Sequence, residues 1–237
     1  MLLRLLSSIV RPKKPAPVQV PQEAAGALRV ALEPGQQTVL DVGGGHRDVA
    51  LPKHYAAWRR LMLDINPSAE PDVLLDARAL GSLPAAQFDA VYCSHNLEHY
   101  REHEVARVLA GFAHVLKPSA GFVEIRVPDI HWIAREMVVN GRELDDTLYT
   151  SPAGPIRVLD ILYGMTSMIE RTGVDFYAHK TGFTRGTLRR ALDAAGFSQA
   201  YFLPPLGRFE IRTVALRTTP GELHRALFGI GEASEAL

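Results

Sequence analysis

Three short apolar runs in the first third of the chain each end in an aspartate, and the first leads into three consecutive glycines. The aspartates are Asp41, Asp64 and Asp76, and the glycines occupy positions 43–45. Apolar runs closed by Gly or Asp are typical of central strands in a parallel sheet, whose carboxyl ends meet at the edge where open α/β folds bind ligands. Glycine lets the backbone approach a ligand closely, and a carboxylate can accept hydrogen bonds from hydroxyl groups. The pattern predicts a crevice for a ligand that contains a nucleoside.

The spacing between the glycines and the second aspartate separates two classes of ligand. Asp64 follows Gly45 by 19 residues (64 − 45), about where a Rossmann-type site places the carboxylate that binds ribose hydroxyls. This spacing fits NAD and S-adenosylmethionine equally. The dinucleotide motif G-x-G-x-x-G, read from Gly43, needs glycine where the chain has Asp48. Because Asp41 would also repel a pyrophosphate and attract the amino group of a methionyl moiety, the residues favour S-adenosylmethionine.

A second group of reactive side chains follows the fourth apolar run, where the sequence reads S-H-N-L-E-H. On a helix, the pattern H-x-x-E-H would be an inverted zinc-protease signature. This segment follows a strand instead, and the sequence has no partner motif that would supply a further ligand. No metal is therefore expected. Ser94 and His95 should emerge beside the reacting group, with His95 as a general base, a cofactor contact or a packing residue. Glu98, His99 and the later His179 are expected to be structural.

Apolar periodicity indicates the elements that position these side chains. Residues 101–117 carry apolar side chains at helical spacing, which predicts an amphipathic packing helix. Strands are expected at 37–42, 60–65, 72–76, 88–93, 122–127, 199–203 and 209–217, and further helices at 22–32 and 184–195.

The segment 131–178 is too long for an ordinary connection. Its aromatic, methionine and glycine residues, which emerge beside the expected crevice, favour a substrate lid. An extra helical layer with its own core is an equal alternative, because Val158 and Ile161 need burial.

Composition limits the class of protein. The 237 residues contain 26 basic and 26 acidic side chains, so nucleic-acid binding is not expected. The one cysteine, Cys93, excludes an intramolecular disulfide and fits a cytoplasmic location. Residues 1–22 are expected to be a flexible basic and apolar tail, with weak membrane-surface contact as the alternative. Residues 23–237 should form a single domain that includes the insertion at 131–178.

Six motifs in order give the chain a resemblance to class I S-adenosylmethionine-dependent methyltransferases, in particular to small bacterial methyltransferases of the type 11 kind. They are V-L-D-V-G-G-G at 39–45, L-D-I-N-P at 63–67, F-D-A-V-Y-C-S-H-N-L-E-H at 88–99, V-L-K-P at 115–118, F-V-E-I-R-V-P-D at 122–129 and H-K-T-G-F-T at 179–184. The chain departs from the pattern at Arg47, where a third glycine is usual, and at Pro52, so its first helix should be short or irregular.

The resemblance implies an α/β, Rossmann-like fold, with a mostly parallel seven-stranded sheet, helices on both faces and an antiparallel edge strand. It also implies S-adenosylmethionine as the cofactor. Together with the residue patterns, it predicts a cofactor site formed by Asp41, Gly43, Gly44, Gly45, Asp64, Ile65, Asp76, Ala77, Ser94 and His95.

The expected activity is methyl transfer to a small-molecule or glycan-type acceptor. The chain has no Asp/Asn-Pro-Pro-Tyr/Phe motif after the fourth strand, which disfavours planar nitrogen acceptors. The alternatives are an NAD-dependent oxidoreductase and a binding protein that keeps the methyltransferase fold without turnover. The acceptor and the oligomeric state remain open.

Overall fold

The computed structural model describes residues 33, 35–151 and 154–230. The expected N-terminal tail (1–22) and the expected helix at 22–32 lie outside the described residues. The sequence-based expectations for the sheet and the crevice fall within them, as does the insertion except for residues 152–153.

A mixed seven-stranded sheet organises the fold, in the order β3-β2-β1-β4-β5-β9-β8. The first five strands are parallel, and β9 pairs antiparallel with both β5 and β8. The edge therefore consists of a hairpin in which β9 has the reversed direction, which confirms the expected fold class. The strands are β1 (Thr38–Val42), β2 (Arg59–Asp64), β3 (Val73–Leu74), β4 (Ala90–Ser94), β5 (Phe122–Pro128), β8 (Gln199–Leu203) and β9 (Glu210–Leu216).

Alternate side chains along the strands bury two separate cores. Leu40 and Val91 point to one face of the sheet, where they pack with residues of α1 (Glu102–Val115) and α5 (Arg185–Ala194). Val39 and Tyr92 point to the other face, beneath η2 (Lys53–Tyr55) and α6 (Glu222–Phe228). Each strand is thus buried on both sides, which explains why its sequence is apolar at consecutive positions.

The connection from β1 to β2 contains only the short helix η2, as the sequence predicts. The side chain of Arg60 organises the rest of it. Its guanidinium donates hydrogen bonds to the carbonyl oxygens of Arg47 (2.9 Å) and Val49 (2.8 Å) and to the carboxylate of Asp41 (2.9 Å). One strand residue therefore replaces much of the backbone hydrogen bonding that a helix would supply.

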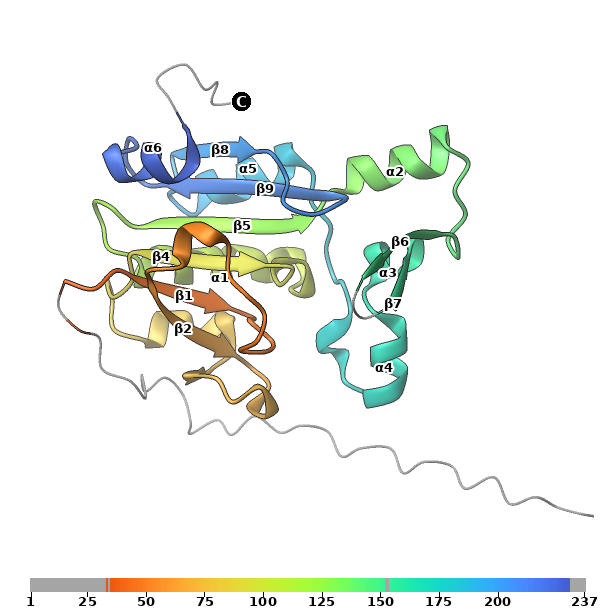
Figure 1. Ribbon diagram of the computed structural model, residues 1–237, viewed down its shortest axis with the longest axis horizontal. Coiled ribbons are helices and arrows are strands. Elements are labelled where there is room, and N and C mark those ends of the chain that lie inside the picture. Colours follow the sequence, from red (N-terminus) through yellow and green to blue (C-terminus); the bar gives the residue numbers. More distant parts are fainter. Residues whose placement is uncertain (1–32, 34, 152–153, 231–237) are drawn as a thin grey trace, which may run out of the picture.

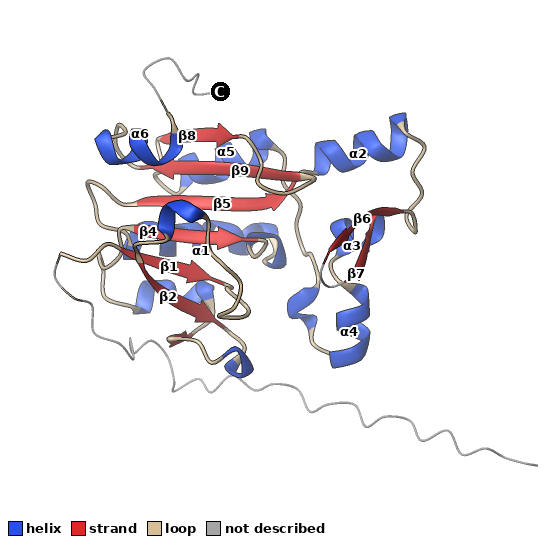
Figure 2. Cartoon of the chain, in the orientation of Figure 1, coloured by secondary structure: helices blue, strands red, loops and turns tan. Residues whose placement is uncertain are grey.

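The insertion leaves the carboxyl end of β5 and lies beyond the ends of the parallel strands, whose arrows point toward it in Figure 1. Figure 2 shows that it mixes helices with a two-stranded hairpin. Its core contains Ile133, Val158 and Ile161 and is completed by Phe209 from the segment before β9. Its elements are α2 (Ile130–Val139), β6 (Thr147–Ser151), β7 (Gly154–Arg157), α3 (Val158–Tyr163), α4 (Thr166–Thr172) and η6 (Asp175–Tyr177).

The insertion therefore has a small core of its own. Whether it acts as a lid or as a fixed layer stays a prediction. Among the helices within the described ranges, none combines the length and the apolar character that crossing a membrane requires.

Candidate functional site

A cavity of about 650 Å³ lies between the carboxyl edge of the sheet and the insertion. The sheet contributes the turns after β1, β2 and β4, including Gly45, Asp64 and His95. The insertion contributes apolar and aromatic side chains, among them Tyr149 and Phe176. The cavity therefore has two unlike walls, one polar and rich in backbone turns, the other largely apolar.

Asp64 and Gly45 form the centre of the polar wall. The backbone N–H of Gly45 donates to Oδ2 of Asp64 (3.0 Å), and the N–H of Asn66 donates to Oδ1 (2.8 Å). Both oxygens keep a further lone pair, and the side chain lines the cavity although the residue is only 9% exposed. The carboxylate is thus held in one orientation and can still accept hydrogen bonds from ligand hydroxyls.

The three glycines of the first loop have different surroundings. A Cβ on Gly43 (φ +71°) would lie 2.1 Å from Nδ2 of Asn96, and one on Gly44 would lie 2.5 Å from Oδ2 of Asp41. A Cβ on Gly45 (φ +65°) would meet nothing within 4 Å. Gly43 and Gly44 are therefore needed for packing of the loop, whereas Gly45 leaves open space beside Asp64.

Six of the ten residues expected at the cofactor site line the cavity: Gly43, Gly45, Asp64, Ile65, Asp76 and His95. The other four, Asp41, Gly44, Ala77 and Ser94, do not line it.

Asp41 departs most from its expected role. Its carboxylate is 3% exposed, and it forms an ion pair with Arg60, whose Nη2 lies 2.6 Å away. Burial raises the pKa of Asp41, while Arg60 opposes that effect. The charge of Asp41 is thus paired with Arg60 inside the fold, and its interaction with a methionyl amino group stays a prediction.

Asp76 both caps a helix and lines the cavity. Its side chain caps the helix η4 (Ala77–Ser82) by accepting the N–H of Arg78 (2.8 Å), and it lines the cavity. Arg78 forms ion pairs with both Asp76 and Glu104. The neighbouring Ala77 is buried in the core. Arg78 and Glu104 also line the cavity, and no local sequence pattern marks them.

His95 stands at the end of β4 with a left-handed backbone (φ +49°), and its N–H donates to the carbonyl of Arg126 (2.8 Å). Its ring lies between two carboxylates, with Nε2 3.2 Å from Oε2 of Glu210 and Nδ1 3.5 Å from Oε1 of Glu98. Desolvation opposes the charge on the ring, but the hydrogen bonds to Glu210 and Glu98 outweigh it and raise the pKa of His95 to about 9. The ring is therefore an imidazolium at neutral pH, a state that cannot take another proton.

His179 lies on the opposite side of Glu98 and has the reverse electrostatics. Its Nδ1 donates to the carbonyl of Ile161 (2.8 Å), and burial lowers its pKa despite the negative charge of Glu98. The expectation that His179 is a hydrogen-bonded residue is confirmed, but its ring also lines the cavity. Glu98 and His99, expected to be structural, line the cavity as well.

The polar wall fits the nucleoside part of S-adenosylmethionine. Asp64 presents a carboxylate to the cavity, and the open space at Gly45 leaves room for a ligand beside it. Gly45, Asp64, Ile65 and Asp76 are the residues that would hold this part of the cofactor.

Comparisons with known proteins agree with this arrangement. Residues 18–200 match the family described as "Methyltransferase domain", which is more than half of the chain. The comparison with curated proteins finds no match.

Several solved structures are similar to the chain. A SAM-dependent methyltransferase from Archaeoglobus fulgidus is 18% identical, with 76% of this chain and 86% of that chain covered and a TM-score of 0.47. One from Methanosarcina mazei is 17% identical, covering 76% and 90%, with a TM-score of 0.46. The 1,6-didemethyltoxoflavin-N1-methyltransferase of Burkholderia thailandensis is 20% identical, covering 78% and 73%, with a TM-score of 0.43. These likenesses assign no substrate to this chain.

The family match and the sheet topology confirm the expected class I S-adenosylmethionine-dependent methyltransferase and its cofactor, and they give no support to an NAD-dependent oxidoreductase. The chain belongs to the methyltransferase domain family.

Proposed function

We propose that this protein transfers a methyl group from S-adenosylmethionine to a hydroxyl oxygen of a small-molecule or glycan-type acceptor. The observation that carries the proposal is that one cavity combines a nucleoside-binding wall with a second wall supplied by the insertion. The cofactor would occupy the first wall, which leaves the second for the acceptor.

The composition of the second wall supports an acceptor rich in hydroxyl groups. Tyr149, Phe176 and Tyr177 supply aromatic surface, and the carboxylates of Asp160 and Asp175 also line this part of the cavity. Aromatic faces can pack against the C–H faces of a sugar ring, while carboxylates accept hydrogen bonds from its hydroxyls. A wall of this mixed character suits a polyol or sugar better than a purely apolar molecule.

The chain itself contributes mainly geometry to the reaction. When bound, S-adenosylmethionine supplies an electrophilic methyl group. Asp64 and Gly45 would fix the position of the nucleoside, and the insertion would exclude water and align the acceptor oxygen. His95 contributes a fixed positive charge balanced by Glu98 and Glu210, and its surroundings do not support the general-base role expected from the sequence.

Two measurements test the proposal. Calorimetric titration should show binding of S-adenosylhomocysteine and none of NADH. Incubation with S-adenosylmethionine and a panel of sugars, polyols, phenols and amines should release S-adenosylhomocysteine only with hydroxyl acceptors. Asp64→Ala serves as the control that loses cofactor binding.

Each alternative has its own result. Binding of NADH without S-adenosylhomocysteine would contradict the methyltransferase assignment. Tight binding of S-adenosylhomocysteine with no turnover across the panel would favour the non-catalytic binding protein.

A further inference from the structure

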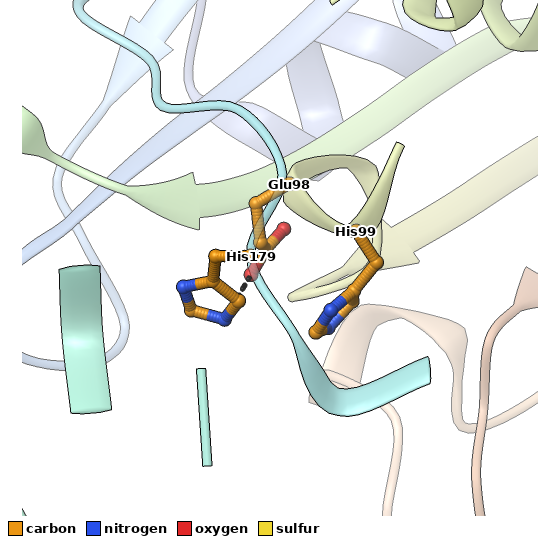
Figure 3. Close-up of side chains that lie close together, drawn as sticks. All are labelled: Glu98, His99 and His179. Carbon is orange, nitrogen blue, oxygen red and sulfur yellow. Dashed lines mark ion pairs between the residues drawn. The ribbon is translucent and has the colours of Figure 1, made fainter. Parts of the chain in front are cut away.

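Three potential metal ligands meet in the cavity wall, where they come from two distant parts of the chain. Glu98 and His99 belong to η5 (Leu97–His99), directly after β4, and His179 follows η6 of the insertion. Figure 3 shows the three side chains converging, with a dashed line joining Glu98 and His179, whose Oε1 and Nε2 atoms are 3.9 Å apart. One ligand atom from each residue lies within 4.8 Å of the other two.

Glu98 is the unusual member of the cluster. The residue is 1% exposed, and neither carboxylate oxygen has a hydrogen-bond partner among the described residues. Nδ1 of His95 is 3.5 Å from Oε1, which leaves Oε2 buried with no nearby donor described. Buried polar atoms are normally paired, so an unpartnered carboxylate oxygen in a cavity wall points to a ligand.

The two histidines are oriented as metal ligands commonly are. Nδ1 of His179 donates to the carbonyl of Ile161 (2.8 Å), which leaves Nε2 without a proton and 3.9 Å from Oε1 of Glu98. Nδ1 of His99 lies 3.0 Å from the carbonyl of Ala178. A histidine that ligates a metal usually donates its other N–H to a backbone carbonyl or a carboxylate, which fixes the ring.

Both ring nitrogens of His99 face backbone carbonyl groups. Its Nε2 lies 3.2 Å from the carbonyl of His95, although a neutral ring can donate from only one nitrogen. One lone pair of a neutral His99 would therefore face a carbonyl oxygen. A small rotation of the ring toward Glu98 and His179 would remove that conflict.

The distances between the side chains fit one ion after a small contraction. A tetrahedral ion with metal–nitrogen bonds near 2.0–2.1 Å holds the ring centroids of two bound imidazoles about 5 Å apart. The ring centroids of His99 and His179 are 4.9 Å apart. The same geometry brings a carboxylate oxygen and a ring nitrogen to about 3.4 Å, so Oε1 of Glu98 and Nε2 of His179 must approach from their 3.9 Å.

We propose that Glu98, His99 and His179 bind one divalent transition-metal ion of the zinc class, with an open coordination position that faces the acceptor half of the cavity. Two histidines, a carboxylate and a free position form the ligand set of catalytic zinc sites and related metal centres. The sequence does not predict this site, because its third ligand lies 80 residues after His99 (179 − 99) and no metal-ligand spacing connects the two.

The role of the ion rests on the proposed function. An acceptor hydroxyl that coordinates at the open position becomes more acidic and releases its proton to solvent. Its oxygen then forms a bond to the methyl carbon while the carbon–sulfur bond breaks and the electron pair goes to sulfur, which leaves neutral S-adenosylhomocysteine.

The test uses the full-length protein after its metal has been removed with a chelator. Titration with Zn²⁺ should show one site, and Co²⁺ should give the visible absorption band of an ion with nitrogen and oxygen ligands. Glu98→Gln and His179→Gln should each weaken Zn²⁺ binding by about 100-fold or more, because each removes a direct ligand and the loss of even an outer-shell partner costs about 10–100-fold. His103→Gln, which removes an exposed histidine on α1, should bind Zn²⁺ like the wild type.

The outcomes separate the metal site from the cofactor site. Absence of Zn²⁺ and Co²⁺ binding, or equal affinity in the wild type, Glu98→Gln and His179→Gln, would overturn the metal site. Titration of the stripped wild type with S-adenosylhomocysteine reports on the cofactor site alone, so failure of that titration counts against the proposed function. Thermal unfolding shows whether each variant is folded, and His179→Gln provides the decisive result if Glu98→Gln does not fold.

Discussion

Nε2 of His95 lies 3.2 Å from Oε2 of Glu210, a residue 115 positions later in the chain. Glu210 also accepts hydrogen bonds from Arg126 and from the backbone N–H groups of Leu206 and Gly207. The imidazole at the carboxyl end of β4 is thereby fixed to β9, across the intervening strand β5. A histidine held by two carboxylates serves as a fixed cation in the cavity wall, not as a proton acceptor.

The charge on His95 should make stability depend on pH in a defined window. Its pKa rises from 6.5 to about 9 on folding, so the stabilisation is complete below pH 6.5 and is lost as the pH rises through about 9. The pKa of Glu210 falls from 4.5 to about 2, so its contribution is present above pH 4.5 and is lost as the pH falls through about 2. Both contributions are complete between pH 4.5 and pH 6.5. The free energy of unfolding of the wild type should therefore exceed that of His95→Gln most near pH 5 to 6.5.

Urea unfolding at a series of pH values measures this difference. Nuclear magnetic resonance of the histidine rings gives the pKa directly, with His95→Gln used to assign the signal. A His95 signal that titrates near pH 6.5 would show that the two carboxylates do not hold the proton.

Asp64→Asn should weaken binding of S-adenosylhomocysteine about tenfold or more. The substitution removes the charge that strengthens hydrogen bonds to ligand hydroxyls, each worth about 1.5–3 kcal/mol. The remaining amide oxygen can still accept one of the bonds from Gly45 or Asn66, so the loop should keep its shape. Calorimetric titration measures the affinity, and Asp48→Asn, in the exposed part of the same connection, is the matched control. Equal affinity in both variants would remove Asp64 from the cofactor site.

Gly43→Ala and Gly45→Ala should differ in stability although both glycines have positive φ. A left-handed backbone costs a residue with a side chain about 1–2 kcal/mol, which applies to both. Only the Cβ at position 43 also collides with Asn96, so Gly43→Ala should lose more free energy of unfolding. Urea midpoints of the two variants measure the difference. Equal midpoints would mean that Asn96 moves aside without cost.

Tyr149→Ala and Phe176→Ala should raise the Michaelis constant for the hydroxyl acceptor that the turnover panel identifies. Both side chains line the insertion wall, and loss of an aromatic contact costs about 0.5–1.5 kcal/mol beyond the lost buried area. The affinity for S-adenosylhomocysteine should stay within about threefold, which corresponds to roughly 0.6 kcal/mol. Tyr163→Ala is the control, because Tyr163 is 57% exposed and does not line the cavity. Loss of S-adenosylhomocysteine affinity in Tyr149→Ala would place that residue at the cofactor instead.

Local sequence predicts the sheet because each strand is a continuous apolar run. β8 is found at the expected residues, 199–203, and the other strands and helices of the sheet region lie close to their expected positions. β3 is the main difference, since only Val73–Leu74 pair as a strand where 72–76 was expected. The runs suffice because burial on both faces favours apolar side chains at most positions. The exceptions in β5, Glu124 and Arg126, are paired with Arg212 and Glu210 on β9.

The candidate site is less predictable because its chemistry depends on contacts between distant residues. Asp41 is acidic at the end of a strand, as a ligand contact would be, but Arg60 on the adjacent strand β2 neutralises it. His95 has the residue type of a general base. Its positive charge depends on the contact with Glu210 on β9, which lies far away in the sequence. His179 reaches the cavity through the fold of the insertion, which no periodic pattern describes.

The position of β9 between β5 and β8 determines the order in which the chain can be assembled during synthesis. Among the described strands, β8 pairs only with β9, so it cannot join the sheet until the later strand has been made. Glu210, the partner of His95, arrives on that same strand. A nascent chain that ends before β9 contains every residue of the nucleoside-binding wall but lacks the carboxylate that orients His95. The pairing of β9 with β5 and the contact between His95 and Glu210 both have long sequence separation and can form only after β9 has been synthesised, which is a slow kind of step in folding.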